Sequence, residues 1–407
     1  MKVKNTICMK IMCAVLALVL AIGAATVGVG AVVIGNYGDA SAKDEIPFYE
    51  FDISRCPHEK MREEWVVERY PDGDVPGAYV RYCETCGKPG ESMEIPPLKV
   101  STASLVINDS LAINFKISKA LMAEGSYKDP YVMVTLRGET AMIGEYQEAG
   151  DYLVFNFDNI APHMMNETIT VQPYAICYGK MCKGKTMEYS VAKYCYNTLD
   201  AYADNAKLRT LLVDLLNYGA AAQVYTGNMT DRLVNANLTD AQKAWGTATD
   251  RQLTTVQDTK YVVRENATVK WKSAGLSLQD SVALRFKIDA TSIEGLYARV
   301  VSQNGIHTIP SSRFVATEGG YYVYYDRLSA ADMSDPVYVT IFDENGPISN
   351  TFSYSAESYA YSMKEKSNNQ RLIDLINTMI RYGDSAKAYV TPDGEGTNPG
   401  ENWVGPY

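Results

Sequence analysis

Apolar and polar residues alternate along residues 111–117 of this 407-residue chain, the first of eight short strand-like segments that form two groups of four. A period of two is typical of half-buried β-strands. The segments are rich in Val, Ile, Tyr and Thr, and Gly, Asn, Asp and Pro separate them, as in antiparallel sheets. The pattern predicts two antiparallel β-sandwich-like domains. Their strands are expected at residues 111–117, 131–137, 152–157 and 168–174, and again at 282–288, 297–302, 321–325 and 337–342.

After each group of strands the apolar residues change to the spacing of a helix. Helices are predicted over residues 191–203 and 206–225, and the second group ends on a matching stripe. The apolar positions are Leu208, Leu211, Leu212, Leu215 and Leu216, and then Leu372, Ile373, Leu375, Ile376 and Met379. The expected fold class is therefore mainly β with α (α+β), with C-terminal helices closing each β domain.

One duplicated unit explains this symmetry. Residues 103–117 (ASLVINDSLAINFKI) align without a gap on residues 274–288 (AGLSLQDSVALRFKI), and roughly half of the aligned positions are identical. The helical segments also end alike, on Tyr218-Gly219 and on Tyr382-Gly383. We expect each of these glycines to let another segment approach the helix closely.

A duplication of this length indicates tandem domains. We place repeat 1 at residues 99–228 and repeat 2 at residues 262–391. Residues 229–261 are expected to be a linker with a short helix that begins at Thr239, and residues 392–407 a flexible tail.

The N-terminal segment predicts export. Lys2, Lys4 and Lys10 precede an uncharged run, residues 11–36, that is long enough to span a bilayer. Positive charge stays in the cytoplasm, so the chain that follows lies outside. Residues 40–42 (Ala-Ser-Ala) form a small-x-small cleavage site. Residues 1–42 are therefore a cleaved signal peptide or a retained membrane anchor, and the protein is expected to be extracellular or on the cell surface.

Residues 43–98 have the spacing of a small metal module. Cys56 and His58 form one close pair, and Cys83 and Cys86, followed by Gly87, form another. Four such ligands suit tetrahedral zinc, and a metal stabilises a segment too short to bury a large core. The alternative is a disulfide between Cys56 and either Cys83 or Cys86, which an external compartment permits. His58 favours zinc, because a disulfide has no use for it.

These motifs carry a resemblance to a known group of proteins. The pattern Cys-x-His…Cys-x-x-Cys-Gly resembles a zinc-ribbon-like module found in secreted and surface proteins of gut Firmicutes. The sequence Tyr-Gly-Ala-Ala-Ala-Gln at residues 218–223 is similar to uncharacterised tandem domains in such proteins. Several modules of this kind have a further Cys in the loop, and residues 72–76 here have none. The resemblance implies a surface location and assigns no chemistry.

Composition and the absence of catalytic motifs limit the classes of function that the sequence allows. A net charge of −10 and a pI near 5.0 argue against nucleic-acid binding, which needs a basic surface. No nucleophile elbow, zinc-protease motif or phosphate loop is present. His163 and His307 fall in loop-like stretches without a shared partner, and we interpret them as exposed loop residues. The sequence therefore favours a non-enzymatic binding or display protein. The alternatives are a structural spacer or adhesin stalk, and an extracellular enzyme that acts on polysaccharide with a carboxylate pair.

Aromatic residues supply the candidate binding surface. The chain has 30 Tyr against 9 Phe, and Tyr joins an aromatic ring to a polar tip. Tyr322 and Tyr324 share a strand, and Trp271 is a further candidate. Sugar rings stack on such faces, so we expect a cell-wall or dietary glycan as the partner, or else a surface protein. An uncleaved N-terminal segment would add the membrane as a partner.

Three cysteines occur in repeat 1 without counterparts in repeat 2. Cys177 and Cys182 flank a four-residue segment and are candidates for a hairpin disulfide in an oxidising compartment. Cys195 aligns with Ala360 on a predicted helix, and we interpret it as a small buried residue.

Overall fold

The computed structural model describes residues 56–391, except for residues 108–110, 124–125, 256–261 and 279–281. Apart from Cys56, these residues belong to one compact unit, Pro57–Tyr407. The signal or anchor predicted at residues 1–42 and the tail predicted at residues 392–407 lie outside the described residues. No helix in the described part of the chain is long and apolar enough to cross a bilayer.

The first described element is a three-stranded antiparallel sheet of β1 (Val66–Arg69), β2 (Gly77–Tyr82) and β3 (Pro89–Ile95). Tyr79 on β2 is buried, and its ring packs edge-on against Tyr178 of repeat 1 with 4.9 Å between the centroids. Its hydroxyl lies 3.1 Å from the Ser126 hydroxyl, so a polar tip within the core is satisfied. The small sheet therefore shares a core with repeat 1.

Repeat 1 contains two antiparallel sheets. The first has the order β4-β5-β9-β8, with β4 (Thr102–Ile107), β5 (Leu111–Ser118), β9 (Tyr152–Ile160) and β8 (Gln147–Ala149). The second sheet contains β11 (Lys180–Lys183), β10 (Ile169–Cys177), β6 (Tyr127–Leu136) and β7 (Glu139–Ile143), in that order. A further short strand, β12 (Met187–Tyr189), also pairs with β10. Buried and half-buried residues alternate along β10 and along β5 from Ile113 onward, so the period of two predicted at residues 111–117 is confirmed for most of that strand.

Repeat 2 has the same arrangement. Its first sheet runs β13-β14-β18-β17, with β13 (Lys270–Leu278), β14 (Val282–Asp289), β18 (Gly320–Tyr325) and β17 (Val315–Thr317). Its second sheet contains β16 (Gly305–Pro310), β15 (Tyr297–Ser302), β19 (Val337–Asp343) and β20 (Gly346–Pro347), in that order. The short strand β21 (Phe352–Tyr354) also pairs with β19. All eight predicted strands are present, and the α+β class is confirmed.

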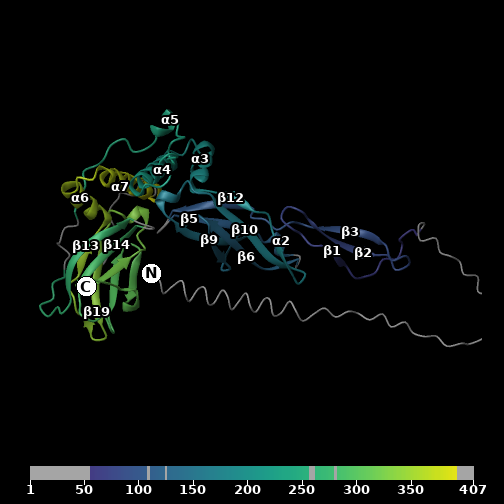
Figure 1. Ribbon diagram of the computed structural model, residues 1–407, viewed down its shortest axis with the longest axis horizontal. Coiled ribbons are helices and arrows are strands. Elements are labelled where there is room, and N and C mark those ends of the chain that lie inside the picture. The colour runs from purple at the N-terminus through teal and green to yellow at the C-terminus, as the bar shows by residue number, and fades with distance from the viewer. Residues whose placement is uncertain (1–55, 108–110, 124–125, 256–261, 279–281, 392–407) are drawn as a thin grey trace, which may run out of the picture. The chain divides into compact units, whose positions relative to one another are not determined.

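Four helices gather where the two repeats meet (Figure 1). They are α3 (Val191–Ala201) and α4 (Ala206–Thr226) of repeat 1, and α6 (Ala356–Lys366) and α7 (Gln370–Val390) of repeat 2. Side chains at matching positions cap them: Ser190 and Ser355 begin the shorter helices, and Asn205 and Asn369 the longer ones. The duplicated sequence therefore includes its helix-start signals.

Helices α4 and α7 pack against each other through equivalent residues. Tyr218 and Tyr382, which occupy the same position in their repeats, stack with 5.6 Å between centroids and 12° between ring planes. Both are buried. Tyr225 at the end of α4 neighbours Tyr359 of α6, and Tyr389 at the end of α7 likewise neighbours Tyr194 of α3. The interface between the repeats is thus isologous, like that of a twofold dimer.

The glycine after each stacked tyrosine lies against a short 3₁₀ turn. These turns are η2 (Pro162–Met164) and η5 (Ala330–Asp332). A Cβ on Gly219 would lie 2.6 Å from Met165 Sδ, and one on Gly383 would lie 3.0 Å from the Ala330 carbonyl oxygen. The prediction that these glycines permit a close approach is confirmed.

We expect Gly383→Ala to destabilise the protein by about 1–3 kcal/mol, because a methyl group would be forced against a backbone oxygen. The sign of this change in the free energy of unfolding is informative, because alanine normally stabilises a helix by about 1 kcal/mol relative to glycine. Thermal unfolding of the full chain measures the change. Arg371→Ala, at an exposed position of the same helix, is the control and should be nearly neutral. A stabilised Gly383→Ala variant would contradict the packing described.

Candidate functional site

The four predicted metal ligands meet in one cluster. One donor atom from each of Cys56, His58, Cys83 and Cys86 lies within 4.8 Å of all the others. Cys56 and Cys83 are buried, and the other two are half-buried. None of the three cysteines forms a disulfide with another described residue. His58 Nδ1 lies 3.4 Å from Cys86 Sγ, close to the edge of about 3.6 Å that tetrahedral zinc imposes between N and S ligands.

Local backbone geometry explains how neighbouring residues converge there. Gly87 adopts a left-handed conformation (φ 67°), and its N–H donates to the Cys83 carbonyl at 2.9 Å, which closes the turn between the paired cysteines. His58 is also left-handed (φ 55°), a strained conformation that a ligand role would justify. The donor set fits a structural metal, because the cluster consists of soft and borderline ligands with no carboxylate.

A second candidate surface covers the outer side of the first sheet of repeat 2. Val323 and Tyr325 on β18 point into the core and are almost fully buried, whereas Tyr322 and Tyr324 are half-buried and point the other way. Their ring centroids are 6.0 Å apart, and the ring planes are tilted by 53°. They are therefore adjacent but not coplanar.

Two cations border these rings. The Arg285 guanidinium carbon lies 5.5 Å from the Tyr322 ring centroid, and Lys287 Nζ lies 5.7 Å from it. In the sheet, Arg285 pairs with Tyr324 and Lys287 with Tyr322. We call these four residues the tyrosine face.

Repeat 1 lacks most of the tyrosine face. Asn114 of repeat 1 occupies the position of Arg285, and Asn156, which pairs with Asn114, occupies that of Tyr324. Asn156 donates a hydrogen bond to Asn114 at 2.8 Å. Val154 replaces Tyr322, and only the lysine is retained, as Lys116. The same fold thus forms without the two tyrosines and the arginine.

Other aromatic pairs on the sheets serve packing. Tyr131 and Tyr174 stack at 5.2 Å and 7°, and Tyr297 and Phe342 stack at 5.4 Å and 15° in the matching place of repeat 2. Directly paired residues of this kind stabilise antiparallel strands. Their ring faces are turned toward each other, so we do not treat them as ligand sites.

Trp271 is half-buried and packs against neighbouring aromatic residues. Its ring lies 5.8 Å from Phe352 and 6.1 Å from Phe286, and its indole N–H donates to the Asn350 carbonyl at 2.7 Å. These contacts hold the ring in place, and its role as a ligand-binding aromatic stays a prediction.

Cys177 and Cys182 lie together on the β10–β11 hairpin as free, buried thiols. Burial raises the pKa of Cys177 to about 12, and its neighbour Cys182 adds to the shift. Both thiols are therefore poor nucleophiles in this state, and the hairpin disulfide stays a prediction. Cys195 is fully buried, as expected.

The interpretation of two histidines as exposed loop residues is wrong. His163 is buried in η2, and its carbonyl accepts a hydrogen bond from Asn228. His307 is half-buried on β16, with its ring 5.8 Å from that of Tyr325. Sequence reasoning missed both because a 3₁₀ turn and a short edge strand have weak local patterns.

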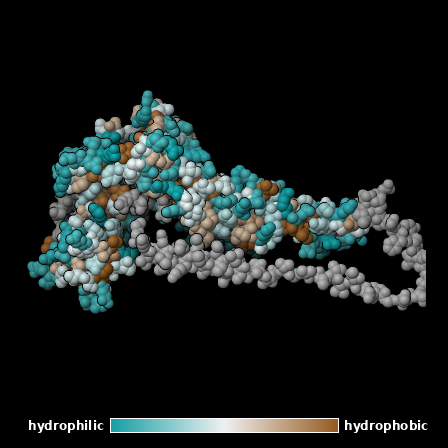
Figure 2. Space-filling model, viewed as in Figure 1, coloured by the Kyte–Doolittle hydropathy of each residue, from teal (hydrophilic) through white to brown (hydrophobic). Residues whose placement is uncertain are grey.

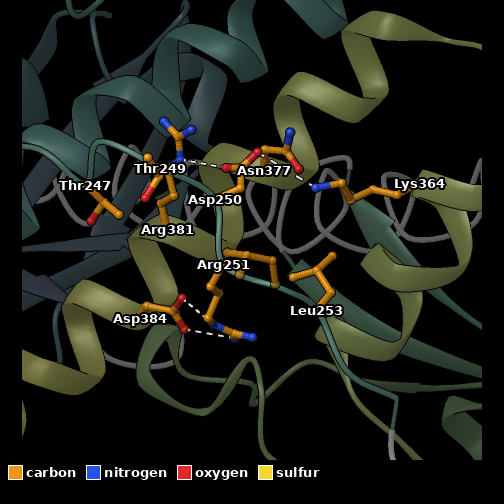
Figure 3. Close-up of a pocket in the computed structure, with 10 residues that line it drawn as sticks. Thr247, Thr249, Asp250, Arg251, Leu253, Lys364, Asn377, Arg381 and Asp384 are labelled. Carbon is orange, nitrogen blue, oxygen red and sulfur yellow. Dashed lines mark hydrogen bonds and ion pairs between the residues drawn. The ribbon is translucent and has the colours of Figure 1, made fainter.

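Residues of the linker, α6 and α7 line a charged pocket (Figure 3). The carboxylate of Asp250 accepts from Arg381 Nε at 2.8 Å and lies 3.8 Å from Lys364 Nζ. Arg251 donates to Asp384 at 2.7 and 3.0 Å, and to Glu357. Because the charges lining this pocket are paired with one another, we interpret it as a clamp on the linker rather than a ligand site.

The buried carboxylate of Asp214 on α4 holds the other end of the clamp. It accepts from the Thr247 N–H at 2.9 Å and from the Thr247 hydroxyl at 2.7 Å. Burial raises the pKa of Asp214, and these hydrogen bonds oppose the shift.

The predicted short helix of the linker is present as α5 (Asp240–Lys243), and Thr239 and Gln242 form a capping box at its start.

Comparisons with known proteins add little to this picture. No protein-family model and no curated protein match the chain. Among solved structures, a pullulanase from Anoxybacillus sp. LM18-11 is similar over 60% of this chain, with 8% identity and a TM-score of 0.15. The chain spans 24% of the length of that structure. A similarity this low carries no argument about fold or function.

Proposed function

We propose that this protein is a non-catalytic binding protein of the bacterial cell surface, and that repeat 2 holds a glycan on its tyrosine face. The observation that carries the proposal is the presence of Tyr322 and Tyr324 on the solvent side of a sheet whose twin has Val154 and Asn156 there. Residues that the fold does not require are free to serve recognition. Tyrosine rings offer apolar faces for the C–H groups of a sugar and hydroxyls for its polar groups.

The tilt between the rings bears on the kind of ligand. Rings at 53° do not make one flat platform, so each tyrosine contacts a different unit of a twisted chain. Figure 2 shows hydrophobic residues scattered over the visible face instead of gathered into one large patch. That face therefore offers no broad apolar interface.

Zinc is the metal that we assign to the cluster of Cys56, His58, Cys83 and Cys86, in a structural role. All four positions are protein ligands, which is typical of structural rather than catalytic zinc sites. The export signal and the resemblance to surface proteins of gut Firmicutes support an extracellular location, with residues 1–42 removed or kept as an anchor.

Replacing Tyr322→Val and Tyr324→Asn together should abolish retention of residues 43–407 on insoluble cell-wall or plant polysaccharides. The replacements are the residues that repeat 1 carries at these positions, so the fold should tolerate them. Losing two stacking contacts of about 1 kcal/mol each should weaken binding about thirtyfold. Tyr361→Ala removes an exposed tyrosine elsewhere and should retain binding.

A structural spacer or adhesin stalk is the second candidate, and the half-buried, tilted rings favour it over a flat sugar platform. The same pulldown separates the two. Absence of retention on every polymer would reject the glycan proposal in favour of the spacer.

A further inference from the structure

The two cations of the tyrosine face have no carboxylate partner among the described residues. Arg285 is exposed and makes no side-chain hydrogen bond or ion pair there. Its guanidinium lies beside the Tyr322 ring, and its charge also lowers the pKa of Tyr354 and of Tyr359 against the larger effect of burial. Lys287 Nζ donates to the backbone carbonyl of Glu318 at 2.7 Å, which leaves its charge unneutralised. By contrast, Lys272 on the neighbouring strand lies 3.3 Å from Asp289. Positive charge therefore remains beside the tyrosines.

Repeat 2 also makes room for the arginine. Gly275 on β13 pairs with Arg285, and a Cβ on Gly275 would lie 3.1 Å from Arg285 Nε. Repeat 1 has Ser104 opposite Asn114 at the same place. The guanidinium thus lies over a strand that has no side chain at that point, and both changes are specific to repeat 2.

The cations and tyrosines form two cross-strand pairs. Arg285 lies opposite Tyr324, and Lys287 lies opposite Tyr322 two residues further along the strand. Residues two apart on a strand are separated by about 7 Å. Each pair therefore consists of one cation and one aromatic ring. Two such pairs in succession suit a polymer in which every unit has one anionic group and one sugar ring.

From this arrangement we infer that the glycan is a polyuronate, a polysaccharide whose sugar units carry carboxylates. The inference rests on the proposed glycan-binding function and names its ligand class. The Arg285 guanidinium offers a carboxylate paired N–H donors, and Lys287 offers a point charge. The tyrosines contact the sugar rings. The net charge of −10 repels polyanions in general, so binding depends on this local group of cations.

The test compares two forms of one polymer by affinity electrophoresis of residues 43–407. Polygalacturonate carries free carboxylates, and its fully methyl-esterified form has the same backbone without the charge. We expect polygalacturonate to bind at least about tenfold more tightly, as expected for hydrogen bonds between charged groups. Single-stranded DNA is the control for a polyanion without sugar carboxylates and should not bind.

Two variants locate the effect. Arg285→Asn, which introduces the residue of repeat 1, should remove most of the preference for the charged polymer. Arg299→Gln removes the same charge from the second sheet, where Arg299 lies over Phe342, and should leave the preference unchanged.

Each outcome bears on the inference. Equal binding of both polymer forms, binding of DNA, or an unchanged preference in Arg285→Asn would overturn the polyuronate assignment. In the first case the proposed glycan-binding function would survive. Binding to neither polymer form overturns the assignment, and absence of retention on every polysaccharide also rejects the proposed function.

Discussion

Cys83→Ser should release the metal and unfold the segment around the cluster of Cys56, His58, Cys83 and Cys86. The purified chain is expected to carry about one zinc ion, and the variant close to none, because a serine hydroxyl is a poor replacement for a thiolate. Metal binding contributes on the order of 10 kcal/mol to comparable small domains, so the effect on this segment should be large. Elemental analysis and hydrogen exchange of residues 57–95 measure metal content and local order.

Cys195→Ala is the matched control, since it removes another buried cysteine and introduces the residue that repeat 2 has as Ala360. It should keep both the zinc and the protection from exchange. Protection of α4 and α7 should survive in Cys83→Ser, because those helices pack in a separate part of the core. A wild-type chain without zinc and with two fewer free thiols would instead establish the disulfide alternative.

Arg251→Ala should destabilise the protein by about 3 kcal/mol by leaving a buried carboxylate without its partner. Glu357 is 3% exposed. Burial raises its pKa, but hydrogen bonds from Arg251 and from the Thr254 N–H outweigh burial and hold the pKa below its ordinary value. The hydrogen bonds from Arg251 to Glu357 therefore stabilise the fold at pH values above the ordinary pKa of a glutamate. This stabilisation is lost as the pH falls through the lowered pKa of Glu357. Chemical unfolding at pH 7 and at pH 3 measures it.

The double variant Arg251→Ala/Glu357→Ala is the decisive comparison. Ala192 occupies the position of Glu357 in repeat 1, so the helix accepts alanine there. Removing the carboxylate as well should restore much of the lost stability, because no buried charge is left unpaired. If the double variant were as unstable as Arg251→Ala, lost packing and not the unpaired charge would explain the effect.

The duplicated pattern predicted much of the fold. Period-two alternation identified β5, the content of Val, Ile, Tyr and Thr identified strands such as β15, and apolar stripes identified α3, α4 and α7. Edge strands such as β17 and β20 were not predicted. They have two or three residues, so their sequences are too short to show a period, and their pairing depends on the neighbouring strand.

The candidate sites divide in the same way. The metal cluster was predictable because its four ligands lie in two short motifs whose chemistry is recognisable along the chain. The tyrosine face was predicted only for Tyr322 and Tyr324. Arg285 was missed because its place beside them depends on strand pairing. The contacts of Trp271 with Phe352 and Asn350 were not predictable either, because these residues come from a distant segment.

The stacking of Tyr218 on Tyr382 has a consequence for how the two repeats can diverge. Two copies of one domain that are joined by a linker meet at an effective concentration in the millimolar range, so dilution does not separate them. Each copy also needs only its helical surface to keep the other in place. The outer sheets are then released from that constraint, and one copy is free to acquire a recognition surface while its partner remains a scaffold.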